Sequence, residues 1–350
     1  MSRPLNNGSL RTVSCWSRGR AAMLAALFVF GANGGQAQVA PNAAVAGLTP
    51  KFVDVGSVPT RYYEYGQGEP MVLVHGGGRG TTSSANNWSP VIPMLAEHFH
   101  VYAVDKSAAG MTGNPVQDSD LSPQGEVRHM YQFLRTMGLD QVHLVGHSSG
   151  GALMFYLAVE HPEIVKTLTV VAQGPGMPRA GEGPTKHDAA EEAQCSAPQT
   201  TYEGRKCRLE LLAHRPDTFD EEFILADGWM ADQTKSREAR AKYSAMGRQA
   251  RRANTVAYRQ QMWDRARNGA LTMPTLIYAA KQDTLSWDAD EPHAMMRGEI
   301  GFFDIVGAKN ARVKMILVNE AGHFPYREHP EQFAADIVHF VEFWNEHPPD

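Results

Sequence analysis

The sequence of 350 residues predicts an α/β fold, in which a mostly parallel central sheet carries helices on both faces. Short apolar runs alternate with helix-like segments from residue 70 to residue 172. The alternation stops there and resumes at Thr275, which indicates a helical insertion of about 100 residues between two core strands. One apolar run ends in Gly-His-Ser-Ser-Gly, residues 146–150, and leads directly into a helix-like segment.

The expected strands are short runs of β-branched, aromatic and other apolar residues. The pattern places them at 52–55, 62–65, 71–74, 101–104, 142–145, 168–171, 275–278 and 313–318. Helices are expected at 88–98, 122–137, 149–160 and 330–345. Ser122 followed by Pro123 is typical of a helix N-cap and first turn.

The composition narrows the class of protein. Hydrophobic residues make up 43% of the chain and charged residues 20%, as in an ordinary soluble globular protein. The formal net charge of −5 gives no general attraction to nucleic acid or to anionic membranes. No apolar run of membrane-spanning length occurs after the N-terminal segment. A small-molecule substrate is therefore the expected partner, and the oligomeric state stays open, with a homodimer as one candidate.

The N-terminal segment resembles a secretory signal peptide. Four arginines and no acidic residue precede a short apolar stretch at 21–32, and Gly35-Gln36-Ala37 offers a cleavage site. Residues 1–37 are therefore expected to be removed on export, which predicts a secreted or periplasmic protein. An uncleaved anchor or a misassigned start codon is the alternative.

The remaining chain divides into three parts. Residues 38–50 are rich in Ala, Pro and Gly and are expected to form a flexible leader. Residues 51–173 and 272–350 are expected to form the α/β core. Residues 174–271 contain no buried strand pattern and are expected to form a helical cap.

The cysteines are consistent with export. Cys15 lies in the expected signal peptide, which leaves Cys195 and Cys207 in the mature chain. In an oxidising compartment this pair can form a disulfide, which would stabilise the fold by roughly 3 kcal/mol in the loop-entropy model. Two unpaired thiols are the alternative.

Residues 142–151 predict a serine nucleophile on a tight turn between a strand and a helix. The small residues Gly146 and Gly150 let the strand and the helix approach closely, so that the turn raises the Ser148 hydroxyl above the sheet. The backbone N–H of Ser149 then faces a bound carbonyl oxygen. The alternative is a glycine-rich turn of an unrelated α/β fold.

A serine nucleophile needs a base and an acid that orients the base. Asp283 follows the strand at 275–278 and is the expected acid, whereas its rivals Asp288 and Asp290 lie further from the strand end. His323 follows the strand at 313–318 behind a glycine and is the expected base. The predicted catalytic residues are thus Ser148, Asp283 and His323, in the chain order of the α/β-hydrolases.

The segment His75-Gly76-Gly77-Gly78 follows another buried strand and is expected to complete an oxyanion hole. One donor is the N–H of Ser149, and the other is the N–H of Gly77 or Gly78. His75 is expected to pack beneath this loop. The alternative is a phosphate-binding loop, but Gly80 is followed by a threonine where that motif requires a lysine.

From about residue 50 onward the chain resembles an α/β-hydrolase with a cap. Several segments resemble the branch of meta-cleavage-product hydrolases, namely 75–80, Asn87-Trp88, 95–99, Asp105 and 112–115. The resemblance implies an α/β-hydrolase fold and hydrolysis of C–C bonds in ring-opened diketones, without a cofactor or a metal. A serine at the elbow also implies an acyl-enzyme, whereas related dehalogenases and epoxide hydrolases have aspartate there.

Three departures from that branch favour a different substrate. Arg79 replaces a typical proline, Phe324 replaces a frequent tryptophan, and the elbow is closer to that of general esterases. With the signal peptide, they predict an exported serine hydrolase of a carboxylic ester or lactone. The alternatives are C–C hydrolysis of a ring-cleavage diketone and a binding protein without turnover. The cap is expected to select the substrate.

Overall fold

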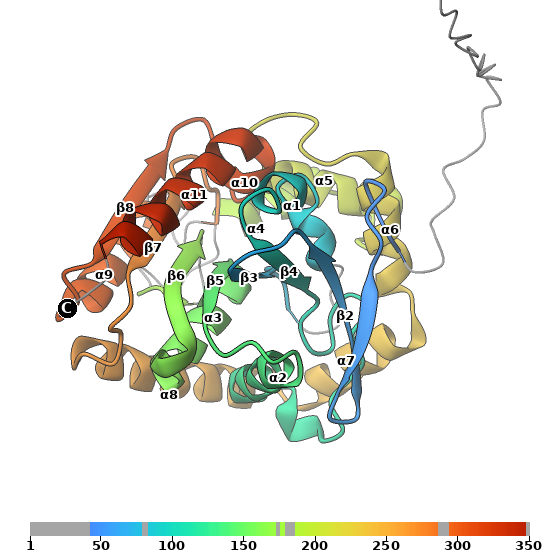
Figure 1. Ribbon diagram of the computed structural model, residues 1–350. Coiled ribbons are helices and arrows are strands. Elements are labelled where there is room, and N and C mark those ends of the chain that lie inside the picture. Colours follow the sequence, from blue (N-terminus) through green and yellow to red (C-terminus); the bar gives the residue numbers. More distant parts are fainter. Residues whose placement is uncertain (1–42, 79–82, 173–175, 179–185, 286–293, 348–350) are drawn as a thin grey trace, which may run out of the picture. The chain divides into compact units, whose positions relative to one another are not determined.

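The computed structural model describes residues 43–78, 83–172, 176–178, 186–285 and 294–347 (Figure 1). The chain contains two compact units, residues 1–36 and 37–350, and all described residues belong to the second. The expected signal peptide, residues 1–37, lies outside the described residues. No helix within the described ranges is both long enough and apolar enough to cross a membrane.

The core is an eight-stranded sheet with the order β1-β2-β4-β3-β5-β6-β7-β8. The pairs β1–β2 and β2–β4 are antiparallel, and the other neighbouring pairs are parallel. The strands are β1 (Lys51–Val55), β2 (Val58–Tyr65), β3 (Pro70–Val74), β4 (His100–Val104), β5 (Val142–His147), β6 (Val165–Val171), β7 (Thr275–Ala280) and β8 (Val313–Val318). The predicted mostly parallel sheet is therefore confirmed.

Alternate side chains of the central strands enter two separate hydrophobic clusters, one on each face of the sheet. In β3, Val72 and Val74 belong to one cluster, and Met71 and Leu73 belong to the other. Helices cover both faces, as Figure 1 shows. The first cluster takes side chains from α2 (Pro123–Thr136), α3 (Ser149–Glu160), α8 (Arg248–Arg267) and α9 (Ala294–Gly307), and the second from α1 (Ile92–Leu95) and α11 (Pro330–Glu346).

Most predicted helices are present at the expected positions. The Ser122 side chain accepts a hydrogen bond from the N–H of Gly125, so it caps α2 as its position before Pro123 predicts. The helix expected at 88–98 is wrong as a single element, because this stretch contains only the end of the 3₁₀ turn Ala85–Trp88 and the four-residue helix α1. Pro93 stands at the start of α1 and prevents one continuous helix through that point.

The insertion after β6 is helical, and its described part contains no strand. Its helices are α4 (Lys186–Gln194), α5 (Tyr202–Leu212), α6 (Glu221–Ala231), α7 (Thr234–Ala245) and α8. The expected cap extends to residue 271 and so includes α8. However, Tyr258, Met262 and Trp263 of α8 are buried in the core cluster with α2 and α3. α8 therefore packs against the core helices α2, α3 and α9.

The expectation of a flexible leader is wrong for residues 43–48. Ala43 and Val45 are buried against Met230 of α6, and the N–H of Ala46 donates to the Glu222 carboxylate at 2.8 Å. The Ala43 carbonyl also accepts from the buried guanidinium of Arg61. Small apolar residues that look like a linker in the sequence thus pack against an element that is distant in the chain.

Cys195 and Cys207 form a disulfide with a Cα–Cα distance of 5.8 Å, which confirms the pair expected from the sequence. Cys195 directly follows α4, and Cys207 lies within α5. The bond therefore fixes these two cap helices to each other.

Replacing both cysteines, as Cys195→Ser with Cys207→Ser, is expected to lower the free energy of unfolding by about 3 kcal/mol, because the unfolded chain loses a closed loop. Urea unfolding of the oxidised protein and the double variant measures this difference. The wild type in reducing buffer should match the variant, and equal stability of all three samples would contradict the expectation.

Candidate active site

The predicted site residues meet at one edge of the sheet. Ser148 directly follows β5, Asp283 follows β7 and His323 follows β8. Since β3, β5, β6, β7 and β8 run parallel, their carboxyl ends share this edge, and the glycine loop after β3 lies there too. Segments separated by up to about 240 residues of chain thereby form one site.

Ser148 has a strained backbone conformation, with φ of 53° and ψ of −121°. Its N–H donates to the carbonyl of Val171 at 2.8 Å, and its own carbonyl accepts from Ala152 in the first turn of α3. β6 and α3 therefore hold the turn from both sides. A strained conformation held in this way is typical of a nucleophile elbow.

Three glycines let the backbone segments around Ser148 approach each other. A Cβ atom on Gly150 would collide with the carbonyl oxygens of Val74 and His75, and one on Gly146 would collide with the Gly150 carbonyl. A Cβ on Gly76 would lie only 2.8 Å from the Ser148 Cβ. The structure thus requires glycine on both sides of the serine and in the loop that faces it.

The substitution Gly150→Ala should destabilise the protein by about 3 kcal/mol or more, because the new methyl group meets backbone atoms that have little room to move. Urea unfolding measures the change. Gly307→Ala at the end of α9 is the control, since its Cβ would meet only Phe303 at 3.8 Å. Equal stability of the two variants would contradict the close packing at the elbow.

His323 and Asp283 form a buried pair. The Nδ1 atom of His323 lies 2.7 Å from Oδ2 of Asp283, and Oδ1 of Asp283 accepts from the N–H of Leu285 at 3.0 Å. With its Nδ1–H donated to the carboxylate, His323 keeps Nε2 as the basic nitrogen. The rival candidates Asp288 and Asp290 lie outside the described residues.

The loop that carries His323 is anchored by contacts that the sequence pattern did not suggest. The His323 N–H donates to the Leu212 carbonyl at 2.8 Å, and the buried Glu328 carboxylate accepts from Gly322, His214 and Arg215. The end of the cap helix α5 therefore contacts the candidate catalytic loop directly. Only the spatial neighbourhood shows this role of Glu328, because nothing in its local sequence indicates it.

His147, next to the nucleophile, is a second residue that sequence reasoning missed. Its Nε2 lies 2.8 Å from the His323 carbonyl, and its Nδ1 lies 3.1 Å from the Tyr326 hydroxyl. Burial holds the pKa of His147 well below its usual value, and the proximity of His323 lowers the pKa further. The ring is therefore neutral, donates from Nε2 to His323 and accepts from Tyr326.

The predicted oxyanion loop lies beside the nucleophile. Ser149 is the first residue of α3, so its N–H is not used by the hydrogen bonds inside the helix. Gly77 has φ of 73°, a conformation that favours glycine, and its carbonyl accepts from the Ser149 hydroxyl at 2.5 Å. The expected donors Gly77, Gly78 and Ser149 thus belong to one connected group.

A cavity of about 340 Å³ opens at these residues. Its walls combine the elbow and the glycine loop with side chains of α2, α3 and the cap. The lining residues are Gly77, Gly78, Pro123, Glu126, Ser148, Ser149, Ala152, Leu153, Tyr156, Tyr243 and Thr255. Besides the serines of the elbow, Tyr156 and Glu126 are among the polar groups of the walls. Burial raises the pKa of the Tyr156 hydroxyl, so the hydroxyl stays protonated.

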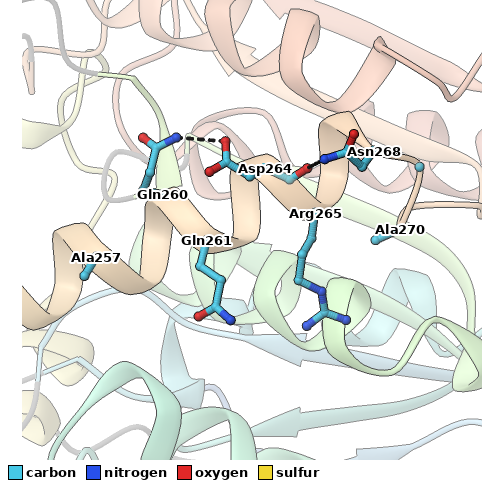
Figure 2. Close-up of a pocket in the computed structure, with 8 residues that line it drawn as sticks. Ala257, Gln260, Gln261, Asp264, Arg265, Asn268 and Ala270 are labelled. Carbon is cyan, nitrogen blue, oxygen red and sulfur yellow. Dashed lines mark hydrogen bonds between the residues drawn. The ribbon is translucent and has the colours of Figure 1, made fainter.

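A larger hollow lies along the end of α8, with a volume of about 760 Å³, and Figure 2 shows its lining. Gln260 donates to the Asp264 carboxylate, Asn268 donates to the Asp264 carbonyl, and Arg265 donates to the Val159 carbonyl. None of the predicted site residues lines it. The side chains of Gln260, Arg265 and Asn268 thus form hydrogen bonds with the protein itself, and the cavity at Ser148 is the better candidate site.

Within the described segments, no group of three or more His, Cys, Asp or Glu side chains is arranged to hold a metal ion.

The substitution Asp283→Asn should lower kcat by about 10⁴-fold, because an amide in this position no longer fixes the Nδ1–H tautomer of His323. Steady-state kinetics on any turned-over substrate measures the change. Asp336→Asn is the control, since its carboxylate accepts from the Tyr278 hydroxyl. A kcat within tenfold of the wild type in Asp283→Asn would exclude the residue as the orienting acid.

Comparison with known proteins gives consistent matches. A family model described as "Alpha/beta hydrolase family" matches residues 71–336. The 2-hydroxy-6-oxo-6-(2'-aminophenyl)hexa-2,4-dienoic acid hydrolase of Metapseudomonas resinovorans is 29% identical over 293 residues, or 83% of this chain and 90% of that protein. The 2-hydroxy-6-oxononadienedioate/2-hydroxy-6-oxononatrienedioate hydrolase of Paraburkholderia xenovorans is 25% identical over 298 residues, or 84% of this chain and 95% of that protein.

Among solved structures, a serine hydrolase involved in carbazole degradation, the CarC enzyme, is similar in fold with a TM-score of 0.64. The two sequences are 26% identical, and the similarity covers 85% of this chain and 99% of that one. The chain therefore spans nearly the full length of these relatives.

Proposed function

Because the chain belongs to the α/β-hydrolase family and has its fold, we propose that it is a serine hydrolase that cleaves a C–C bond in a ring-cleavage diketone. The observation that carries the proposal is the His323–Asp283 pair at the sheet edge that bears Ser148, in a chain similar along its length to a dienoic acid hydrolase. The ester or lactone hydrolase expected from the sequence becomes the second candidate.

The first chemical step is attack on the ketone. Nε2 of His323 takes the proton of the Ser148 hydroxyl as Oγ bonds to the carbonyl carbon. The electrons of the C=O double bond move to oxygen, and the N–H groups of Ser149 and of Gly77 or Gly78 stabilise the resulting oxyanion.

Collapse of this intermediate breaks the C–C bond. The bonding electron pair passes to the leaving carbon, where conjugation with the substrate's second carbonyl group spreads the negative charge. His323 returns its proton to the leaving fragment. A water molecule, deprotonated by His323, then attacks the acyl group on Ser148 and releases the acid, and the serine regains its proton.

The lining of the cavity supports a substrate with an apolar part. Ala152, Leu153 and Tyr243 offer apolar contact, whereas Tyr156 and Glu126 add polar groups to the walls. Tyr243 of α7 brings a large cap side chain to these walls. Tyr258, Met262 and Trp263 belong to the core instead.

The second candidate, ester hydrolysis, uses the same first step and differs in the leaving group, which is an alkoxide. One observation favours it: two departures from the meta-cleavage pattern, the elbow residues His147 and Ser149 and the residue Phe324, contact the histidine loop or the glycine loop. The other departure, Arg79, lies outside the described residues. A substrate comparison separates the two candidates, since both require the same triad.

The wild type should hydrolyse a chromogenic aryl dienone acid with a kcat/KM at least about tenfold above that for p-nitrophenyl butyrate, and Ser148→Ala should lose about 10⁴-fold on both. Absorbance assays measure both reactions. Ser244→Ala on the exposed face of α7 is the matched control.

Faster turnover of the ester would favour the second candidate. Undiminished turnover by a folded Ser148→Ala protein would contradict both. A protein that binds the dienone without turning over either compound would be a binding protein with a hydrolase fold.

A further inference from the structure

Lys106 is a buried lysine directly beside the predicted oxyanion hole. It follows β4 by two residues, and only 1% of its surface is exposed. Its Nζ donates to the Gly77 carbonyl at 2.6 Å and to the Ser149 hydroxyl at 2.7 Å. One ammonium group thus contacts both segments that supply the expected oxyanion donors.

The backbone at Lys106 is tied to the same loop. Its N–H donates to Nε2 of His75 at 3.0 Å, and Nδ1 of His75 lies 2.7 Å from the Gly76 carbonyl. Burial, with the nearby Lys106 charge, lowers the pKa of His75 to about 3, so the imidazole is neutral. With Nε2 as the acceptor, Nδ1 carries the proton and donates to Gly76. His75 therefore fixes the glycine loop to the end of β4.

The contact with Gly77 sets the direction of the following peptide group. In a planar trans peptide the C=O of Gly77 and the N–H of Gly78 point in opposite directions. Since Lys106 and the Ser149 hydroxyl both bind the Gly77 carbonyl, the Gly78 N–H faces away from them. The contact of Lys106 therefore fixes the orientation of the peptide group between the two candidate donors, Gly77 and Gly78.

We propose that Lys106 is a positioning residue of the oxyanion hole, which joins the glycine loop to Ser149 and so holds the N–H donors of these two segments in their relative position. The proposal rests on the serine-hydrolase mechanism proposed above, and it applies to ester and diketone substrates alike. Nothing in the five-residue elbow motif requires a lysine at this position.

The substitution Lys106→Met keeps the length of the side chain and removes its charge and hydrogen bonds. It should lower kcat by about 100-fold, as removal of an oxyanion donor does, and leave KM within about threefold. The rate at which a fluorophosphonate labels Ser148 should fall in parallel, because phosphonylation also forms an oxyanion. This labelling measurement requires no knowledge of the natural substrate.

Lys235→Met is the matched control. Lys235 is a half-buried lysine, and its Nζ likewise donates to two backbone carbonyls, those of Ala109 and Thr112. Both substitutions should lower the melting temperature, but only Lys106→Met should slow labelling and turnover. A labelling rate in Lys106→Met equal to that of Lys235→Met would overturn the proposal.

Ser149→Ala provides a second measurement that leaves Lys106 in place. It removes one of the two hydrogen bonds of the ammonium group, together with the hydrogen bond from Ser149 to the Gly77 carbonyl, and labelling should slow by about tenfold. Should Lys106→Met fail to fold, an unchanged rate in Ser149→Ala would overturn the proposal, and a slowed rate would support it. A wild type that is not labelled would overturn the serine mechanism itself, and the role of Lys106 with it.

Discussion

The close approach of three backbone segments at Ser148 is the constraint on which the site depends. The serine is held at φ of 53° because β5, α3 and the loop after β3 meet there with glycine at each contact. Such a conformation costs of order 1–3 kcal/mol, which the surrounding hydrogen bonds and packing must offset. The strain fixes where the hydroxyl, the Ser149 N–H and the glycine loop lie relative to one another.

The site also depends on the cap. The carbonyl of Leu212 at the end of α5 binds the His323 N–H, and a Cβ atom on Gly322 would lie 2.6 Å from that same carbonyl. The disulfide joins α4 to α5, so it constrains the helix that touches the histidine loop. The cap therefore contributes to the position of His323 as well as to the walls of the cavity.

Much of the fold could be predicted, because its signals are local. Each strand is a short apolar run, and Ser148, Asp283 and His323 each follow such a run, so their common edge follows from parallel pairing. The helix expected at 88–98 is wrong, although Pro93 is a local signal against a continuous helix there.

The features that the sequence could not predict depend on contacts between segments that are distant in the chain. The packing of Ala43 on α6 and the ties of Glu328 to the His323 loop join segments that have no pattern in common. The burial of α8 could be predicted in part, because Tyr258, Met262 and Ala266 recur at helical spacing and form a buried face. The place of Lys106 could also be predicted from the sequence. It follows a buried strand and Asp105, and therefore lies at the same sheet edge as Ser148, Asp283 and His323.

The central claim is that Ser148 forms a covalent acyl-enzyme with the substrate. The most direct measurement is acid quenching during the first turnover of a dienone acid, followed by peptide mapping with mass spectrometry. The account predicts the acyl fragment of the substrate on the peptide that contains Ser148. Complete turnover while that peptide stays unmodified, or an adduct on another residue, would contradict it.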